Sequence, residues 1–323
     1  MSTTNATLTG TDTPSREGRL RQAWASPSLN LQRVLAMVLL VCQGGITVTG
    51  SLVRVTGSGL GCDTWPLCHE GSLVPVAGAA PWVHQAIEFG NRLLTFVVGM
   101  AAGLVLLAVY RAARRKEVKV LAWISLLGVV VQAVIGGISV LLDLRWWSVA
   151  VHFLPSMVLV WVAATLYMRI AEPDDATPTR RYPAAVRGWT VAAAVALCFV
   201  LVTGTMVTGS GPHSGDSGVG MEGRLELDTE MLAYTHAAFL YVYLIATLVV
   251  VYLLRKHNAP KDAFTTSLVL VTAIIVQWAI GVIQFRMGVP RWTIPAHIGM
   301  SSIVVAFSAF LFAHGKRRLP TLV

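Results

Sequence analysis

Eight long apolar segments constrain the fold of this chain more than any other feature of its sequence. A helix that crosses the hydrocarbon core of a bilayer needs about 20 predominantly apolar residues. The segments cover residues 34–55, 84–110, 120–141, 148–169, 188–208, 231–254, 264–286 and 293–314. Hydrophobic residues make up 55% of the chain and charged residues only 13%, so the bilayer is the expected solvent. The sequence predicts an all-α integral membrane protein of eight transmembrane helices, with its chemistry among the helices.

Basic residues are unevenly distributed between the two sides of this predicted membrane protein. Most of the 25 lysines and arginines lie in the two tails and in the second, fourth and sixth linkers. Short cytoplasmic loops collect positive charge, so both termini are predicted to be cytoplasmic. The formal net charge of +9 follows from this bias and from attraction to the anionic lipid bilayer. No nucleic acid partner is needed to explain it.

An internal repeat divides the chain into two similar halves. Residues 131–136 read VQAVIG and residues 276–281 read VQWAIG, an offset of 145 residues. The same offset relates two further pairs, Trp147 with Trp292 and His152 with His297. The first helix of each half ends in VTGSG, at 55–59 and 207–211. Each half has an even number of spans and enters the membrane in the same orientation. The repeat therefore predicts two parallel-duplicated four-helix bundles.

The repeat and the polar segments also set the expected domain boundaries. They are a disordered cytoplasmic tail at 1–33, an N-terminal half at 34–170, a solvated cytoplasmic linker at 171–187, a C-terminal half at 188–314 and a second tail at 315–323. The first 30 residues contain no apolar core, which excludes a cleaved secretory signal. A transit peptide is the alternative interpretation of this tail.

Three histidines occupy equivalent positions near one side of the membrane. Subtracting the offset of 145 from His236 gives Asn91, so each half has a polar residue on its second helix and a histidine on its fourth. Two neutral imidazoles that face each other at one depth can bind a six-coordinate haem iron. His236 and His297 are therefore predicted haem ligands, and His152 with Asn91 forms the incomplete counterpart. The alternatives are a histidine that only bonds a neighbouring helix, and a zinc or copper site, which lacks further ligands at suitable spacing.

A carboxylate distinguishes the first half from the second. His84, Glu88 and Asn91 are spaced by four and three residues and share one helix face. A buried carboxylate is costly in a membrane, so Glu88 is interpreted either as an ion-pair partner of Arg92 or Arg54, or as a catalytic residue. The catalytic role is to donate a proton or to stabilise developing positive charge. His84 lies at the membrane edge, either solvated or part of the site.

Two of the four cysteines are expected to form a disulfide. Cys62 and Cys68 lie six residues apart in the first external loop, on the oxidising side. Metal binding by this pair would leave an exposed and incomplete site, even with the neighbouring His69. The residues between them predict a tight loop that covers the first site or receives redox equivalents; they include Asp63, Trp65 and Pro66. The other two cysteines lie in apolar spans and are expected to behave as small hydrophobes, Cys42 and Cys198.

These motifs together resemble those of haem A synthase. The matching segments are VRVTGSGLGCDTWPLC at 53–68, IEFGNR at 87–92, GSGPHSGD at 209–216 and the histidines at the heads of the fourth, sixth and eighth helices. The resemblance covers about residues 34–314. Asn91 departs from the family pattern, which commonly has a second histidine three residues after the glutamate. In this respect the chain resembles actinobacterial members.

The resemblance implies a bacterial plasma-membrane enzyme that oxidises the C8 methyl group of haem O to a formyl group by successive O2-dependent hydroxylations, for assembly of haem-copper terminal oxidase. It implies haem b at His236 and His297, and haem O as substrate in the first half. We expect His152 to be the only firm protein ligand of the substrate iron, with Asn91 bonding a ligand on the open face; the alternative is that Asn91 only hydrogen-bonds a neighbouring helix. The electron donor is not identified; haem O synthase and terminal oxidase assembly factors are the expected partners.

Other protein classes account for less of the sequence. A di-haem electron carrier of cytochrome b type explains the histidines but not Glu88 or the asymmetry between the halves. A transporter is weakened because the clustered intramembrane polar groups are the same few residues. A haem O synthase is disfavoured because the sequence has no pair of Asp-rich motifs for diphosphate and Mg²⁺.

Overall fold

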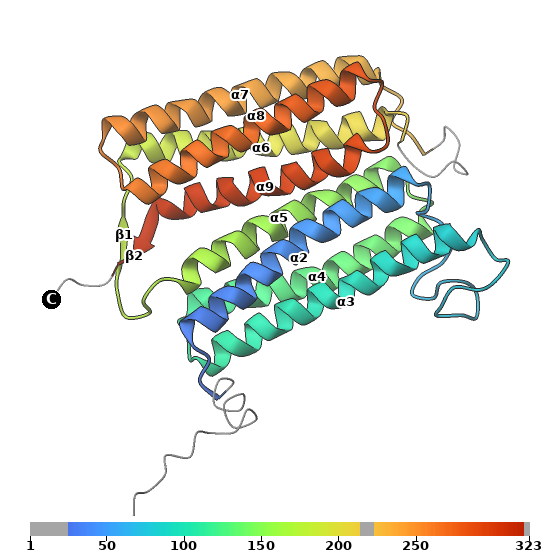
Figure 1. The fold of residues 1–323 in the computed structure, drawn as a ribbon, viewed down its shortest axis with the longest axis horizontal. Helices are drawn as coiled ribbons and strands as arrows, with labels where there is room; N and C mark the ends of the chain where they lie inside the picture. Colours follow the sequence, from blue (N-terminus) through green and yellow to red (C-terminus); the bar gives the residue numbers. More distant parts are fainter. Residues whose placement is uncertain (1–24, 214–222, 320–323) are drawn as a thin grey trace, which may run out of the picture.

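The computed structural model describes residues 25–213 and 223–319, and this part of the chain forms eight helices long and apolar enough to cross a membrane. Figure 1 shows them as α2 (Leu29–Val55), α3 (Trp82–Arg111), α4 (Lys116–Leu141), α5 (Trp146–Ile170), α6 (Ala184–Ser210), α7 (Thr229–Lys256), α8 (Lys261–Arg286) and α9 (Thr293–His314). The predicted all-α membrane fold with eight spans is confirmed. The predicted tail at 1–33 lies largely outside the described residues, as does part of the GSGPHSGD segment.

Several helices begin before the apolar segments that predicted them. α2 starts at Leu29 rather than at residue 34, and the hydroxyl of Ser28 caps it by accepting a hydrogen bond from the Leu31 amide at 3.2 Å. Asp228 caps α7 in the same way through the Met231 amide at 2.6 Å. Hydropathy detects only the part of a helix that contacts lipid, whereas a polar cap beyond it sets the true end.

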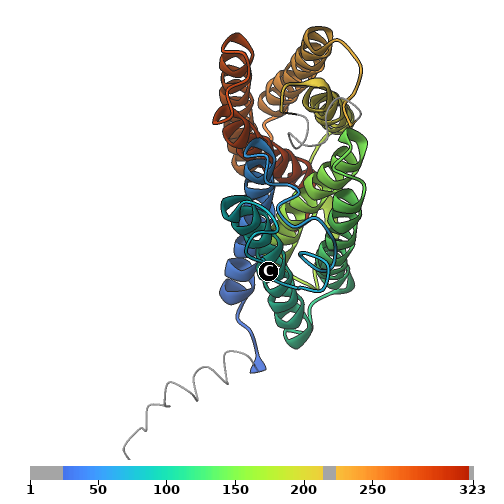
Figure 2. The same ribbon diagram turned by 90° about the vertical axis from the view of Figure 1, so that its right-hand side faces the viewer.

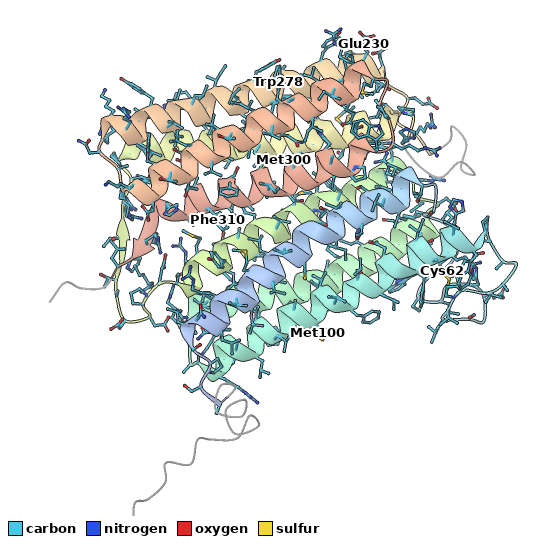
Figure 3. All side chains as sticks on the ribbon, in the orientation of Figure 1. Cys62, Met100, Glu230, Trp278, Met300 and Phe310 are labelled. Atoms are coloured by element: carbon cyan, nitrogen blue, oxygen red, sulfur yellow. A yellow bond between two sulfur atoms is a disulfide. The ribbon has the colours of Figure 1, made fainter. Side chains whose placement is uncertain are left out.

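The helices form two groups of four that lie side by side. In Figure 1 the lower group holds α2 to α5 and the upper group α6 to α9, and Figure 2 shows the same two groups from the side. The groups meet where α5 and α2 pack on α9 and where α5 packs on α6. Their outer faces carry exposed apolar side chains, such as Phe96 at 76% and Met100 at 62% exposure (Figure 3). Lipid chains would cover such faces.

The two ends of the bundle differ in chemistry. We call the end formed by residues 56–81, 142–145, 211–213, 223–228 and 287–292 the histidine end, on the right in Figure 1. The opposite end, formed by 112–115, 171–183, 257–260 and 315–319, is called the arginine end. There β1 (Pro178–Arg180) pairs antiparallel with β2 (Lys316–Arg318). This pairing attaches the linker between the halves to the end of the second half.

The linker is not fully solvated, which corrects the sequence interpretation. The side chain of Glu172 is 1% exposed because three guanidinium groups surround it. Arg115 lies 2.9 Å away, Arg169 2.7 Å and Arg317 3.4 Å. A buried carboxylate is tolerated when it is paired in this way. The linker thus packs into a charged layer that contains residues of both halves.

Candidate functional site

Two histidines face each other inside the second half. His236 extends from α7 and His297 from α9, and their ring centroids are 6.4 Å apart with an angle of 59° between the ring planes. A metal–nitrogen bond of about 2 Å on each side of one iron places the centroids of two axial imidazoles roughly 6 Å apart. The pair predicted from the sequence is therefore brought together at a separation that fits a single haem iron.

The surroundings of His236 leave one ring nitrogen available. Its Nδ1 lies 3.0 Å from the carbonyl oxygen of Val200 and 3.2 Å from the hydroxyl oxygen of Thr203, both on α6. A proton on Nδ1 donated to the carbonyl leaves Nε2 unprotonated, which is the form that binds a metal. Gly204 permits this approach, since an added Cβ would lie 3.2 Å from Cε1 of the ring.

His297 is only partly satisfied by the protein. The amide nitrogen of Gln277 on α8 lies 3.0 Å from its Nε2, and that amide also donates to Ser301 at 2.9 Å. The Nδ1 atom is buried, with no hydrogen-bond partner among the described residues. Because an unpartnered buried polar atom is unfavourable, the ring is suited to accept a ligand. Gly281 again provides the space, with an added Cβ 3.3 Å from Cε1.

A small cavity lies on the axis of the second half, beside the histidine pair. Its volume is about 20 Å³ and all four helices line it, through Leu197, Val200, Leu201, Leu240, Tyr243, Ile274, Gln277, Ser301 and Val304. A haem is far larger, so binding would require side chains to move apart. Among these helices α6 packs chiefly on α7 and α8 on α9; α7 also packs on α8, whereas α6 and α9 touch little. The α6–α7 pair carries His236, and the α8–α9 pair carries His297.

The first half has the equivalent residues at the predicted offset, although its glutamine contacts the backbone of the histidine rather than the ring. Gln132 on α4 donates to the carbonyl oxygen of His152 at 2.7 Å and to the hydroxyl of Ser156. An added Cβ on Gly136 would lie 3.0 Å from Cε1 of His152. The Nδ1 atom of His152 is buried and, within 25–213 and 223–319, has no hydrogen-bond partner. His152 therefore sits in the same framework of glutamine, serine and glycine as His297.

Asn91 occupies the position that corresponds to His236. Its Oδ1 accepts a hydrogen bond from the hydroxyl of Thr49 on α2 at 2.7 Å, just as Thr203 on α6 contacts His236. Both threonines belong to a VTG sequence, at 48–50 and 202–204. The first half thus carries an amide where the second carries an imidazole.

Glu88 forms the ion pair that was one of its two interpretations. Its Oε1 accepts from Nη2 of Arg92 at 2.6 Å and its Oε2 accepts from the Cys62 amide at 2.7 Å. Arg54 bonds elsewhere: it reaches from α2 to the carbonyl oxygens of Thr208 at 2.7 Å and His213 at 2.6 Å. Glu88 is buried at 5% exposure. Oε2 therefore fastens the loop that contains Cys62 to α3, whereas Oε1 holds Arg92 of the same helix.

Arg92 and the predicted disulfide hold that loop together. Cys62 and Cys68 are bonded, which confirms the prediction, and neither is exposed. Arg92 donates to three carbonyl oxygens of the loop, those of Cys62 at 2.9 Å, Thr64 at 2.9 Å and Leu67 at 3.0 Å. The loop is consequently fixed against α3 at the histidine end, where Cys62 is labelled in Figure 3.

The two remaining histidines of this region have protein partners. His69 is buried, with Nδ1 2.9 Å from a carboxylate oxygen of Asp63 and Nε2 2.9 Å from the amide oxygen of Gln85. Nδ1 of His84 lies 2.9 Å from the hydroxyl of Ser58. Both rings thus stabilise the turns around the loop.

The sequence interpretation missed the residues that support the histidines. Gln132 and Gln277 lie in the repeated VQxxIG motif, and Ser156 and Ser301 follow their histidines by four residues in both halves. Comparing the two halves position by position would have found them. The contact between Trp65 of the loop and Gly137 of α4 has no such signal, because the second half does not repeat it.

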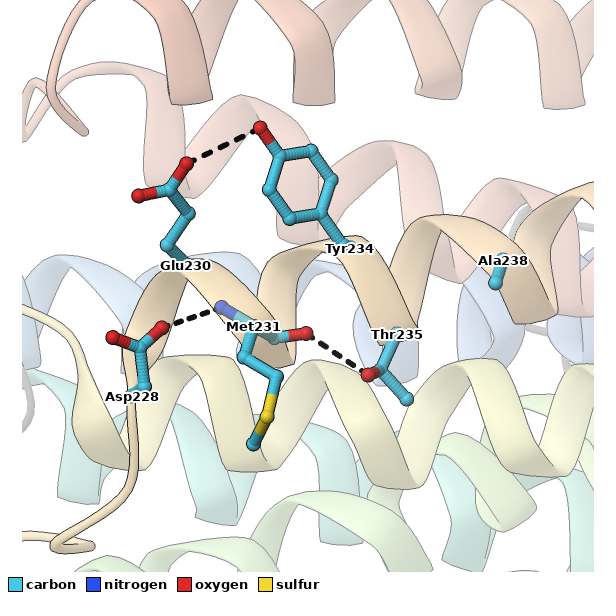
Figure 4. A pocket seen from close by; sticks show the side chains of 6 residues that line it. All are labelled: Asp228, Glu230, Met231, Tyr234, Thr235 and Ala238. Carbon is cyan, nitrogen blue, oxygen red and sulfur yellow. Dashed lines mark hydrogen bonds between the residues drawn. The ribbon is translucent and has the colours of Figure 1, made fainter.

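A second hollow lies away from these residues. It measures about 560 Å³, opens widely to the outside and is lined only by α7 and its cap, through Asp228, Glu230, Met231, Tyr234, Thr235 and Ala238. Figure 4 shows its hydrogen bonds, including that from Tyr234 to Glu230 at 3.2 Å. It contains no histidine and is not the candidate site.

Comparisons with known proteins identify the family of the chain. The model of the COX15-CtaA family, described as cytochrome oxidase assembly protein, matches residues 33–213, more than half of the chain. The haem A synthase of Listeria welshimeri is 31% identical over 148 residues, 44% of this chain and 46% of that protein. The haem A synthase of Exiguobacterium sibiricum is 29% identical over 164 residues, 50% of this chain and 54% of that protein. The chain thus spans about half the length of these relatives. Since the matched region contains Glu88, Asn91 and His152 with the disulfide loop, this chain belongs to the COX15-CtaA family of cytochrome oxidase assembly proteins.

Proposed function

We propose that this protein is a haem A synthase, which oxidises the C8 methyl group of haem O to a formyl group. The observation that carries the proposal is the asymmetry between two otherwise equivalent sites. The second half has an imidazole at both proposed ligand positions, whereas the first half has His152 at one and Asn91 at the position equivalent to His236. Membership of the family and the similarity to proteins named haem A synthase support the same activity.

The second half is the proposed site of a haem b cofactor, held by His236 and His297. The separation of the two rings, the free Nε2 of His236 and the unpartnered Nδ1 of His297 all fit this group. When bound there, haem with two protein ligands supplies one-electron transfer, since it has no open position for O2. Gln277 and the carbonyl oxygen of Val200 orient the two rings.

The first half is the proposed site for haem O, with His152 as the protein ligand of its iron. Asn91, at the position equivalent to His236, is the proposed residue on the other side of the iron, and an amide there would not close that side as an imidazole would. Glu88 is the proposed catalytic residue, a negative charge near the reacting group. Its bonds to Arg92 and the Cys62 amide hold it in place.

The stoichiometry of the proposed reaction determines which reactants the protein needs besides haem O. Each hydroxylation places one atom of O2 in the product and releases the other as water, which requires two electrons and two protons. A second hydroxylation at the same carbon gives a hydrated aldehyde, and loss of water leaves the formyl group. An electron donor is therefore a required partner, and haem O synthase and terminal oxidase assembly factors are the proposed neighbours that deliver substrate or receive product.

We place the protein in the bacterial plasma membrane, with the arginine end and both termini in the cytoplasm. This orientation follows the distribution of basic residues. It puts the histidine end, the disulfide and both candidate sites near the external face, where an oxidising environment preserves the Cys62–Cys68 bond.

The test is expression in a bacterial host that makes haem O but no haem A, followed by chromatography and mass spectrometry of the extracted haems. A new haem carrying a formyl group is expected with the wild-type chain and not with an empty vector. Haem binding without any change in the extracted haem O would instead support the di-haem electron carrier of cytochrome b type.

A further inference from the structure

Trp65 of the disulfide loop lies directly against a helix of the first half. Its indole ring occupies the place that a Cβ on Gly137 of α4 would need, with Cδ2, Cε2 and Cγ as the nearest atoms. The preceding residue, Gly136, faces the ring of His152, whose Cε1 would lie 3.0 Å from an added Cβ. Two consecutive glycines therefore bring the indole and the proposed iron ligand to one turn of the same helix.

Arg92 holds the backbone on both sides of Trp65. Its Nη1 donates hydrogen bonds to the carbonyl oxygens of Thr64 and Leu67. Arg92 is itself held by Glu88. The side chain of Trp65 is half-buried, so one part of the indole faces the helices and another faces outward.

The equivalent position of the second half carries a side chain. The offset of 145 relates Gly137 to Val282, which is 39% exposed. An aromatic ring could not approach the backbone of α8 here as closely as Trp65 approaches that of α4, because valine has a side chain where glycine has none. The Trp65 contact is thus specific to the half that has the incomplete ligand pair.

We propose that Trp65 is the lid of the first-half site, a specificity-determining residue that packs against haem O bound at His152 and separates it from water at the histidine end. The inference rests on the proposed function. An indole offers a large, rigid apolar surface suited to a porphyrin edge, and exclusion of water protects a reactive site from side reactions. Arg92 acts as a positioning residue, because it holds the loop that carries Trp65.

The experiment compares four variants of the full-length protein in detergent. Gly137→Val removes the seat, Trp65→Ala removes the ring and Trp65→Phe keeps an aromatic ring. Gly103→Val on α3 is the matched control, since an added Cβ there has no neighbour within 4 Å. The first measurement is the rate at which tris(2-carboxyethyl)phosphine reduces the Cys62–Cys68 disulfide, followed by alkylation and mass spectrometry without added haem. The second is the KM and kcat for haem O.

Loss of the lid should expose the disulfide and weaken substrate binding. We expect Gly137→Val and Trp65→Ala to speed reduction by about tenfold, as local opening becomes easier, and to raise the KM for haem O more than they lower kcat. Trp65→Phe should restore most of the affinity, and Gly103→Val should behave as wild type. If Gly137→Val does not fold, the two Trp65 variants carry the test.

The lid is refuted if Trp65→Ala keeps both the wild-type reduction rate and the wild-type affinity for haem O. Failure of the proposed function is a separate result: the wild-type protein would then leave haem O unchanged. In that case the reduction rates and the binding of haem O, measured by optical titration, still decide whether Trp65 covers a site at His152.

Discussion

Asn91 and His236 are equivalent residues, because each bonds a threonine on the first helix of its own half. Thr49 donates to Asn91 at 2.7 Å, and Thr203 lies 3.2 Å from Nδ1 of His236. Three of the four proposed ligand positions are therefore histidines, and the fourth, Asn91, has the same kind of hydrogen-bond partner. An imidazole at position 91 would meet the same threonine and would complete the proposed ligand pair.

Asn91→His should accordingly close the first-half site. We expect a partly high-spin substrate haem to become low-spin and the conversion of haem O to slow, since both faces of the iron would carry a strong ligand. Optical and electron paramagnetic resonance spectra measure the spin state. Thr49→Val is the control, because it removes the hydrogen bond without adding a ligand. An unchanged spin state and rate would show that the open face does not matter, and His84 or water should then be tested as the sixth ligand.

His236→Ala and His297→Ala should each remove the stable low-spin haem of the second half. The affinity should fall by more than about 100-fold, because even the loss of an outer hydrogen-bond partner of a metal ligand costs about 10-fold to 100-fold. The purified variants are compared by reduced-minus-oxidised spectra and haem content. His257→Ala is the matched control, an exposed histidine at the arginine end. Normal low-spin spectra in both variants would remove these residues from the site.

Substituting the two repeated glutamines gives a matched pair of variants, whose expected effects on haem binding are smaller. Gln277 contacts His297 at 3.0 Å, and Gln132 contacts the His152 carbonyl at 2.7 Å. Gln277→Leu should lower the affinity for the cofactor haem by about 10-fold to 100-fold while leaving haem O binding intact. Gln132→Leu should do the reverse. Equal effects of both variants on both haems would mean that the halves do not hold separate sites.

Glu88→Gln separates a chemical role from a positioning role. The amide keeps the size of the carboxylate but loses its charge, so conversion should fall by about 100-fold to 1,000-fold while haem is still bound. Arg92→Lys is the companion variant, because it keeps a positive charge near Glu88 but cannot bond three carbonyl oxygens of the loop. In both variants, the rate at which the Cys62–Cys68 disulfide is reduced measures how firmly the loop is held. If Glu88→Gln loosens the loop as much as Arg92→Lys, and turnover falls in parallel, Glu88 acts through the loop rather than on the substrate.

The charged layer at the arginine end should weaken in acid. Burial raises the pKa of Asp174, but hydrogen bonds from Arg114 at 2.7 Å and Arg115 at 3.0 Å outweigh this effect and hold the pKa below its ordinary value. A lowered carboxyl pKa contributes stability above the unfolded pKa of about 4, and this contribution is lost as the pH falls through the folded value. The hydrogen-exchange protection factors of residues 171–180, which are corrected for the intrinsic pH dependence of exchange, should therefore fall below about pH 4. Asp174→Asn should lower these protection factors at neutral pH and make them nearly independent of pH; a wild-type pH profile of the protection factors in this variant would contradict the assignment.

The sequence was sufficient to predict those features that depend on local composition or on the internal repeat. The eight spans, the Cys62–Cys68 disulfide and the equivalence of Asn91 with His236 are of this kind. The burial of Glu172 was missed, because its partner Arg317 is far away in the chain and the surrounding residues look like a solvated linker. The seat of Trp65 on Gly137 was missed for a similar reason: hydropathy does not reveal which loop folds back onto which helix.

The bonds between the two halves have a mechanical consequence. At one end Arg54 of α2 bonds carbonyl oxygens of Thr208 and His213, and at the other Glu172 bonds guanidinium groups from both halves. Alternating access in transporters needs one repeat to rock against the other, and a frame fastened at both ends resists such rocking. Such a frame would hold the two proposed haem sites at one fixed spacing, which suits electron transfer between them.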